Sequence, residues 1–409
     1  MVMLDLEIKV TSSIEEFVAH NGPKFSYSSR SLGNELFFYS SSLLIDQGIQ
    51  DISINVIETE KYPFFFKVNG KSAMTFDVFA ASFYLITRYE EYLPHLKDDL
   101  GRFQYQESLA FKNDFLDKPI VDIWIVELIK ILNKKFGIKI QIKNNKKKII
   151  PILEVAEAFE FSHKSIFSSF LQAVISIWKL NLKKFIIQIK VLLRISDDPY
   201  LNYDCIIDQF KKLKIDFLSF FRFTQHSLDI YSVSIFNSSH RLLIKSISDK
   251  TPLGLLVSFY AQNNINILKD EMNNLTKLIH RNSQKIRLNL GILSISEIYP
   301  MLIQNQILED YSMGYVDKVG FRASTSIPFY YYDLVNEVQS PLKIYPIVIT
   351  QFALRSLSIE NTFKKIKSLY LALPLKNSNF CFVFTPKIFS ESKEYSKLLS
   401  SFIKFTDET

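Results

Sequence analysis

From about residue 148 onward, short apolar runs of strand length alternate with segments in which apolar residues recur at helical spacing. Repeated strand-then-helix units predict parallel strands joined by crossover helices. Six such units predict an α/β fold, a distorted (β/α) barrel with its chemistry at the carboxyl ends of the strands. The expected strands are 149–155, 215–221, 253–259, 285–293, 342–349 and 379–384, and the expected helices lie near 203–213, 266–281, 294–306, 356–370 and 391–404.

The first part of the chain has a different pattern. Amphipathic helices are expected over 76–92 and 121–136, and 138–143 alternates like a strand. This mixture predicts a smaller α+β domain over residues 1–146, followed by the barrel over 147–409.

The most apolar helical segment, 166–195, is interrupted by Lys179, Lys183, Lys184 and Lys190. It does not meet the requirement of about 20 apolar residues for a transmembrane helix. An amphipathic helix that lies on a membrane surface remains an alternative. The N-terminal residues lack the basic and apolar regions of a signal peptide, so a cytoplasmic location is expected.

Composition narrows the function classes. The chain holds only 10 Gly and has neither a GxG nor a GxxxxGK motif, which argues against a P-loop or a standard dinucleotide-binding domain. A net charge of +7 over 409 residues is mild, so nucleic-acid binding is not expected. The densest basic run, 143–148, is interpreted as a solvated turn. Cys205 and Cys381 stand in apolar runs and are expected to be buried thiols.

Two long blocks carry a resemblance to a known family. They are FDVFAASFYLITRYEEYLPHLKDDLGRFQYQESLAFKNDFLDKPIVDIW (76–124) and EDYSMGYVDKVGFRASTSIPFYYYDL (309–334), with DPYLNYD (198–204) between them. Together they resemble bacterial proteins of the polysaccharide-deacetylase type, which join a small N-terminal domain of unknown function to a deacetylase-type (β/α) barrel. The resemblance implies metal-dependent deacetylation of a glycan. It also implies an Asp-x-Asp after the first barrel strand, histidine ligands after a later strand and a histidine acid after the last strand.

The chain departs from that pattern at the expected metal ligands. Glu154 falls at the first Asp of the pair and Ala156 at the metal-binding Asp, while Thr251 and Leu256 fall at the histidine ligands. Glutamate could act as a base, but alanine and leucine cannot bind a cation. The family's divalent metal is therefore predicted to be absent, and no other cofactor is expected.

The remaining catalytic positions are also changed. Thr385 falls at the acid histidine, and Gln351 at an aspartate that orients the base. No two histidines of the chain have the spacing of a metal pair, and each is interpreted as a surface or capping residue. The histidines are His20, His95, His163, His226, His240 and His280.

Arg322, in the sequence GFRAST, does match the family's arginine. One interpretation is a retained pocket wall in which Arg322 meets Glu154 or a glycan oxygen. The other is a structural pair with a buried carboxylate where the strand ends. Arg322, Asp310, Tyr311 and Tyr315 are the predicted substrate-binding residues, and Glu154 is the one catalytic candidate.

The charged residues of the first block form either a ligand site or, as preferred, an interdomain salt-bridge network. Trp124 packs in that interface or offers a face for sugar stacking. The charged residues are Arg88, Glu90, Glu91, Asp99, Arg102 and Asp122.

The leading hypothesis is a pseudoenzyme that binds a glycan or a pathway protein in bacterial surface-polysaccharide metabolism. A second hypothesis is an active deacetylase or hydrolase that uses Glu154 as base, with Glu157 or Asp310, and no metal. A third is a scaffold whose basic segment 166–195 touches a membrane or another protein.

Overall fold

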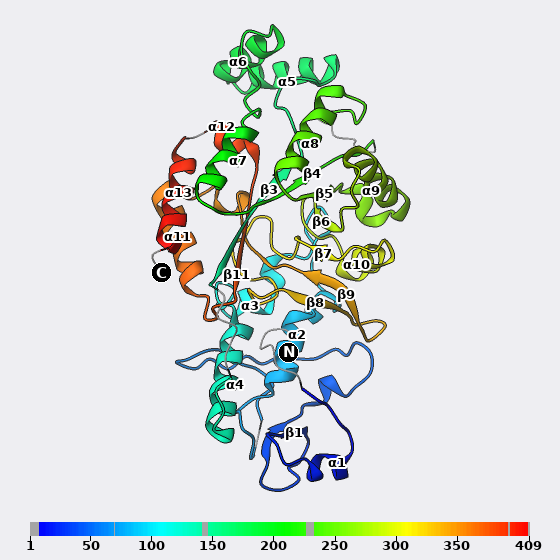
Figure 1. Ribbon diagram of the computed structural model, residues 1–409, viewed down its shortest axis with the longest axis vertical. Coiled ribbons are helices and arrows are strands. Elements are labelled where there is room, and N and C mark those ends of the chain that lie inside the picture. The colour runs from blue at the N-terminus through cyan, green and yellow to red at the C-terminus, as the bar shows by residue number, and fades with distance from the viewer. Residues whose placement is uncertain (1–7, 69, 141–145, 226–232, 392, 408–409) are drawn as a thin grey trace.

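The computed structural model describes the 409-residue chain except residues 1–7, 69, 141–145, 226–232, 392 and 408–409. Its centre is a nine-stranded mixed sheet in the order β10-β11-β3-β4-β5-β6-β7-β9-β8 (Figure 1). All neighbouring strands are parallel except the β8–β9 hairpin. The strands are β3 (Lys148–Val155), β4 (Leu218–Phe221), β5 (Leu253–Val257), β6 (Lys285–Leu288), β7 (Glu309–Asp310), β8 (Phe329–Asp333), β9 (Val338–Ile344), β10 (Ile347–Thr350) and β11 (Asn379–Phe384).

The sheet curls so that β10, at one end, approaches the segment that follows β7. β10 is the last strand at one end and β9 lies near the other end, yet only residues 345 and 346 separate them along the chain. The Ile347 backbone N–H donates to the Met313 carbonyl at 2.8 Å, which ties β10 to the segment after β7. The predicted run 342–349 is therefore two strands that serve both ends of a curled sheet.

Side chains on one face of the curled sheet fill its interior. Ile152 of β3 clusters there with Phe220 of β4, Leu256 of β5 and Tyr311 after β7. A Cβ atom at Gly254 would lie 2.4 Å from the Phe220 ring, so glycine is required for this packing. The interior is thus a packed core rather than an open channel.

The opposite face packs against the crossover helices and the helices that follow β11. Alternate residues of the strands, such as Leu153 and Leu255, join the largest hydrophobic cluster together with helix residues such as Ile206 and Leu275. This alternation confirms the predicted β-then-α units. The helices are α7 (Tyr203–Lys212), α8 (Ser238–Lys250), α9 (Ile265–Ile279), α10 (Ile295–Gln304), α11 (Ile359–Leu371), α12 (Pro386–Glu391) and α13 (Lys393–Asp407).

The residues before β3 supply a separate hydrophobic cluster, to which Tyr315 and Leu334 of the later chain also belong. Helix α4 contributes Trp124, whose ring packs on Phe65 and Phe76. The domain boundary at 146/147 stays a prediction. Residues 138–140 have no regular structure, and the rest of the expected strand 138–143 lies outside the described residues. The elements are α1 (Ile14–Ala19), β1 (Phe25–Ser28), β2 (Leu36–Tyr39), α2 (Val78–Ile86), α3 (Leu109–Lys112) and α4 (Ile120–Phe136).

The apolar segment 166–195 forms two helices, α5 (Ile166–Trp178) and α6 (Leu182–Leu192), at one end of the molecule (Figure 1). Leu180 between them has a positive φ of 55°, and Asn181 caps α6 through a side-chain bond to the Lys184 N–H. Within the described residues, no helix has the length and apolar character needed to cross a bilayer.

The expectation of two buried thiols is half wrong. Cys381 of β11 is buried, but Cys205 is exposed on α7. On that helix Ile206, Ile207 and Phe210 face the core. Position 205 therefore points outward, although the apolar residues Ile206 and Ile207 follow it directly.

Candidate functional site

A buried ion pair occupies the carboxyl end of the barrel interior. Arg287 of β6 donates from Nε to Glu154 Oε2 of β3 at 2.6 Å, and from Nη1 to the Tyr311 carbonyl at 2.6 Å. Both side chains are less than a tenth exposed. Glu154, the candidate base, is thus held in a buried ion pair with the Arg287 guanidinium. Of the expected partners, neither Arg322 nor Asp310 contacts it.

The positions assigned to metal ligands do not assemble into a cation site. Thr251 precedes β5 and bonds Ser219 across the start of β4, so it lies at the opposite end of the strands from Glu154. Leu256 and Ala156 belong to the apolar interior. Ser258 and Gln262 are buried polar residues that follow β5.

Gln262 is engaged in loop structure, because its amide donates to the carbonyls of Asn289 and Gly291 at 3.1 and 3.0 Å. In the part of the chain that the structure describes, no group of three or more His, Cys, Asp or Glu side chains is placed to hold a metal ion. Ala156 and Leu256 offer no donor atom, and the Glu154 carboxylate is already paired with Arg287, so these residues do not fit a divalent metal.

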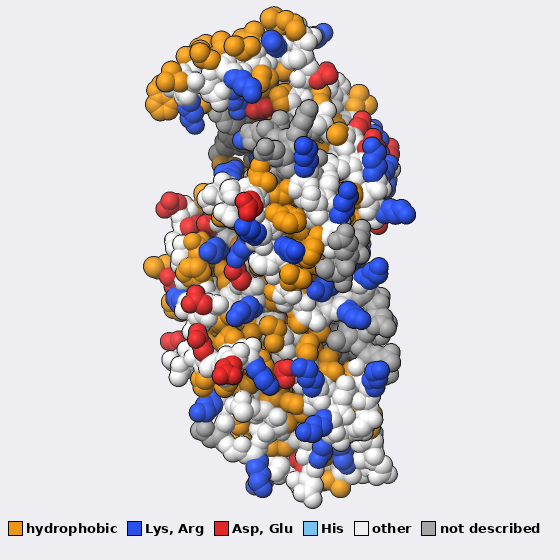
Figure 2. Space-filling model, turned by 90° about the vertical axis from the view of Figure 1, so that its left-hand side faces the viewer, with side chains coloured by type: hydrophobic (Ala, Val, Ile, Leu, Met, Phe, Trp, Pro, Cys, Tyr) orange, Lys and Arg blue, Asp and Glu red, His pale blue; other side chains and the backbone are white. Residues whose placement is uncertain are grey.

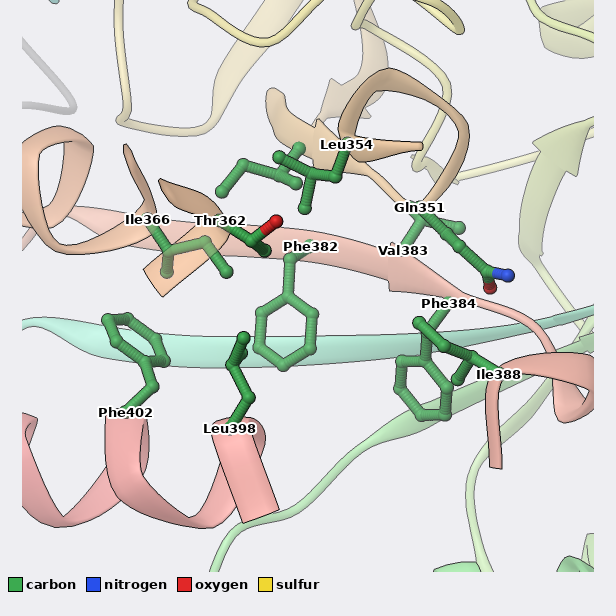
Figure 3. A pocket seen from close by; sticks show the side chains of 11 residues that line it. Gln351, Leu354, Thr362, Ile366, Phe382, Val383, Phe384, Ile388, Leu398 and Phe402 are labelled. Carbon is green, nitrogen blue, oxygen red and sulfur yellow. The ribbon is translucent and has the colours of Figure 1, made fainter. Parts of the chain in front are cut away.

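Gln351 and Thr385 do come together, after β10 and β11. Gln351 Oε1 accepts hydrogen bonds from the Thr385 N–H and hydroxyl, both at 2.9 Å. Gln351 also borders an apolar cavity of about 60 Å³ between these strands and the C-terminal helices. Figure 3 shows Phe382 of β11 and Phe402 of α13 directed into this space. Its lining offers few polar groups for a substrate.

Arg322 pairs with a carboxylate of the N-terminal region instead of Glu154. Its Nε and Nη2 donate to Glu91 Oε1 and Oε2 at 2.9 and 2.6 Å, a bidentate pair. Arg88 donates to the same carboxylate at 2.7 Å and to Glu90 at 2.7 Å. Arg88 also donates to the Arg322 carbonyl and to the Tyr315 hydroxyl. These contacts form the salt-bridge network between the first block and the barrel.

Electrostatics in this network favour the charged forms. Burial acts to raise the pKa of Glu91, but the guanidinium groups of Arg322 and Arg88 lower it to about 2. The side chains of Glu91, Arg322 and Arg88 are 4%, 3% and 0% exposed. Water therefore screens the attraction little, and the network holds the two parts of the chain together.

Asp122 makes a second contact between the two regions. It accepts hydrogen bonds from the Thr325 hydroxyl, the Ser326 hydroxyl and the Ser326 N–H. Burial nevertheless raises its pKa to about 6. Trp124 is nearly fully buried and its indole N–H donates to the Pro63 carbonyl at 3.1 Å, so it offers no face to a sugar.

Asp310 and Tyr311 are core residues. Asp310 accepts from the Tyr299 hydroxyl at 3.0 Å and from the Ser312 hydroxyl, and burial raises its pKa to about 6. Tyr311 stacks on Tyr345 at 4.4 Å inside the barrel. Neither residue lines a described cavity.

A polar cavity of about 240 Å³ lies at the carboxyl ends of β6 and β7. Its walls are the segment 98–106 of the N-terminal region and the loops 291–292 and 314–317. Arg322 and Tyr315 border it. Two of the four predicted substrate-binding residues therefore line the same cavity.

The cavity combines aromatic rings, carboxylates, amides and a guanidinium. Arg102 is paired with Asp98 at 2.7 Å, not with Asp99, and Tyr105 lies 6.2 Å from Tyr315 between ring centroids. Asp317 is exposed at the rim. The lining residues are Asp98, Arg102, Phe103, Gln104, Tyr105, Gln106, Gly291, Ile292, Gly314, Tyr315, Val316, Asp317 and Arg322.

The described histidines are dispersed. His20 and His280 cap the ends of α1 and α9, as expected. His240 instead lies in the core between Phe159 and Phe223, where burial lowers its pKa to about 4. His95 and His163 pack on phenylalanine rings, and His226 lies outside the described residues.

Sequence reasoning missed Arg287 and the wall of the polar cavity contributed by residues 104–106. A signal for Arg287 did exist, because it is the one charge inside the apolar part of KIRLNL and takes an inward position of β6. Residues 104–106 carry no local sequence pattern that indicates a cavity, because the cavity forms only where they meet the loops 291–292 and 314–317.

Comparisons with known proteins assign only part of the chain. Residues 1–137 match a family of unknown function, DUF7033. None of the curated proteins matches the chain.

Several solved structures are similar at 9% identity. One, from Mycobacterium smegmatis, is assigned as a polysaccharide deacetylase, with a TM-score of 0.37 over 63% of this chain and 85% of its own. A CE4 family pseudoenzyme from Bacillus anthracis gives 0.33 over 65% and 62%. An allantoinase gives 0.42 over 65% and 86%. They include the group expected from the sequence, but likenesses this low establish neither an activity nor a shared site.

Proposed function

We propose that this protein binds a glycan in the polar cavity between segment 98–106 and the loops after β6 and β7. It would act as a pseudoenzyme of the polysaccharide-deacetylase type in bacterial surface-polysaccharide metabolism, without metal-assisted deacetylation. The observation that carries the proposal is the contrast between two places at the same end of the barrel. The polar cavity is lined by Tyr105, Tyr315 and charged groups, whereas the interior beside it is filled by the Glu154–Arg287 pair.

The lining suits a sugar for chemical reasons. Sugar hydroxyls both donate and accept hydrogen bonds, and the cavity offers the Asp317 carboxylate, the Gln106 amide and the Arg102 guanidinium. Pyranose rings present an apolar C–H face, which packs on aromatic side chains such as Tyr105. The cavity volume of about 240 Å³ suits one sugar ring of a glycan rather than several consecutive sugars.

An active hydrolase based on Glu154 receives less support. That hypothesis requires Glu154, Arg322 and a second carboxylate to converge in one open cleft. Glu154 is 7% exposed and pairs with Arg287, while Arg322 pairs with Glu91. Phe220 and Leu256 pack in the interior beside Glu154.

Titration calorimetry with acetylated amino-sugar oligomers tests the proposal. We expect binding by the full chain, strong weakening in Tyr105→Ala and Asp317→Ala, and no change in Asp216→Ala, which removes an exposed carboxylate far along the sequence. The same preparations are assayed for metal content and deacetylation. Stoichiometric zinc with turnover that a chelator abolishes would overturn the pseudoenzyme proposal. Equal binding by wild type and both cavity variants would overturn the assigned site.

A further inference from the structure

The helices α5 and α6, here called the α5–α6 hairpin (residues 166–195), stand apart from the barrel. They are inserted between β3 and its crossover helix α7 and form one end of the molecule (Figure 1). A crossover from β3 to β4 needs only α7, so the hairpin is an addition to the barrel unit. Its role must be sought in its own surface.

The hairpin is inside out relative to a water-soluble helix pair. Its buried side chains are Ser168 and Ser176 on α5, and Gln188 and Val191 on α6. Gln188 Nε2 donates to the Ser169 carbonyl at 2.7 Å, which joins the two helices through a polar contact. Small and polar residues between helices, with apolar residues outside, are the arrangement found in lipid.

The outward face of the hairpin is almost continuously apolar. Figure 2 shows hydrophobic side chains gathered along this end of the molecule, with lysine or arginine beside them. Trp178 is 80% exposed and Ile166 is 91% exposed. The exposed apolar residues are Ile166, Phe167, Phe170, Val174, Ile177, Trp178, Leu180, Leu182, Ile186, Ile189, Leu192, Leu193 and Ile195.

Charge distinguishes among the surfaces that could cover this face. The chain has no Asp or Glu from residue 161 to 196, whereas the same stretch holds six basic residues. A second copy of the hairpin would bring like charges together, which is unfavourable. An anionic lipid surface would instead attract the basic groups and bury the apolar ones. The basic residues are Lys164, Lys179, Lys183, Lys184, Lys190 and Arg194. Of these, Lys164 lies before the hairpin, its side chain is 0% exposed and it pairs with Glu157 at 3.1 Å, so it does not contribute to the charged surface.

We propose that the α5–α6 hairpin docks this protein on the surface of an anionic lipid bilayer. The helices have 13 and 11 residues, too short to span a bilayer, so they lie in the interface with their apolar face among the acyl chains. Trp178, at the end of α5, takes the position at the lipid–water boundary that tryptophan favours. Lys184 has a different role, because it pairs with Glu160 at 3.0 Å and anchors the hairpin to the barrel.

The two tryptophans make a direct measurement available. Trp124 is buried in the N-terminal cluster, while Trp178 is exposed. A change in the polarity around Trp178 therefore dominates any shift in the tryptophan emission. With vesicles of phosphatidylcholine and phosphatidylglycerol, we expect a blue shift of the full chain's emission and protection from acrylamide. With phosphatidylcholine alone, or at high salt, both effects should be much weaker.

Vesicle co-sedimentation of variants locates the contact. Neutralising Lys179, Lys183 and Lys190 to Gln should weaken partitioning into anionic vesicles about a hundredfold, at roughly fivefold per lysine. The matched control neutralises three exposed lysines of α8 and α9 and changes the net charge equally. The control lysines are Lys245, Lys269 and Lys277.

A second pair of variants tests the apolar face. Trp178→Ser with Phe170→Ser should abolish binding, and Phe236→Ser, which alters an exposed ring outside the hairpin, should not. Equal loss in both lysine triples would overturn the proposal. An unchanged emission spectrum of the wild-type chain with anionic vesicles would also overturn it. So would dimers that form at high protein concentration, dissociate in Trp178→Ser and do not bind vesicles.

Discussion

Replacing Glu91 by Gln removes one charge from the buried network and keeps the shape of the side chain. Two guanidinium groups, of Arg322 and Arg88, then lose their shared carboxylate in a site where the side chains are at most 4% exposed. Removing one partner of a buried ion pair costs about 3–5 kcal/mol. We expect Glu91→Gln to lower the free energy of unfolding by about that amount at neutral pH.

The pKa of Glu91 provides a second route to the magnitude. A lowering from 4.5 in the unfolded chain to about 2 in the folded protein corresponds to about 3 kcal/mol. Because the folded pKa is depressed, this stability is present above pH 4.5 and is lost as the pH falls towards 2. The difference between wild type and Glu91→Gln should therefore shrink from about 3 kcal/mol at pH 7 to about 1 kcal/mol at pH 3.

Urea unfolding followed by the fluorescence of Trp124 is the assay, with midpoints and slopes measured from pH 7 to pH 3. Glu360→Gln is the matched control, because Glu360 pairs with Lys364 at 2.6 Å on the exposed surface of α11 and its loss should be undetectable. A loss for Glu91→Gln below about 1 kcal/mol at pH 7, or a loss independent of pH, would refute the assignment of Glu91 as the centre of the network.

Three further predictions concern packing, proton uptake and the polar cavity. Gly254→Ala should cost about 1–3 kcal/mol in urea unfolding because its Cβ would lie 2.4 Å from the Phe220 ring, while Gly33→Ala, whose Cβ meets only Glu35 at 3.6 Å, should not destabilise. As the pH rises from 5 to 7, the free energy of unfolding of Asp310→Asn should increase by about 1 kcal/mol relative to that of wild type. The reason is that the Asp310 pKa of about 6 makes wild type lose stability over that range, and equal pH profiles would contradict the burial assigned to it. Tyr105→Ala should strongly weaken glycan binding while the protein stays folded, with only a modest fall in the unfolding midpoint because its ring packs on Phe111 at 5.0 Å; a folded variant that binds like wild type would contradict the assigned site.

The barrel illustrates what local pattern can predict. The apolar runs at β3 and β11 appear in the structure almost at their expected bounds, because parallel strands buried on both faces need continuous apolar residues. The run 342–349 was assigned to one strand and is two, because the sheet curls and a single stretch of chain pairs at both ends of it. Curling is a property of the whole sheet and leaves no local mark.

The charged residues show the same division. Arg88, Glu91 and Arg322 could be recognised as candidates for a network, since charges within apolar segments need partners when buried. Which carboxylate Arg322 meets could not be read from the chain, because residues 91 and 322 are brought together only by packing of the N-terminal region on the barrel. That Arg287, rather than Arg322, pairs with Glu154 was unpredictable from the sequence for the same reason.

By itself, the sequence determined the alternation of strands and helices, the absence of a histidine pair and the unusual apolar and basic character of residues 166–195. These features depend on composition and on spacing along the chain, which are local. The tertiary structure alone decided that the apolar face of the hairpin points outward, that Glu154 pairs with Arg287, and that a polar cavity forms beside residue 105. Each of these depends on contacts between distant segments, and such contacts are selected by the packing of the whole molecule.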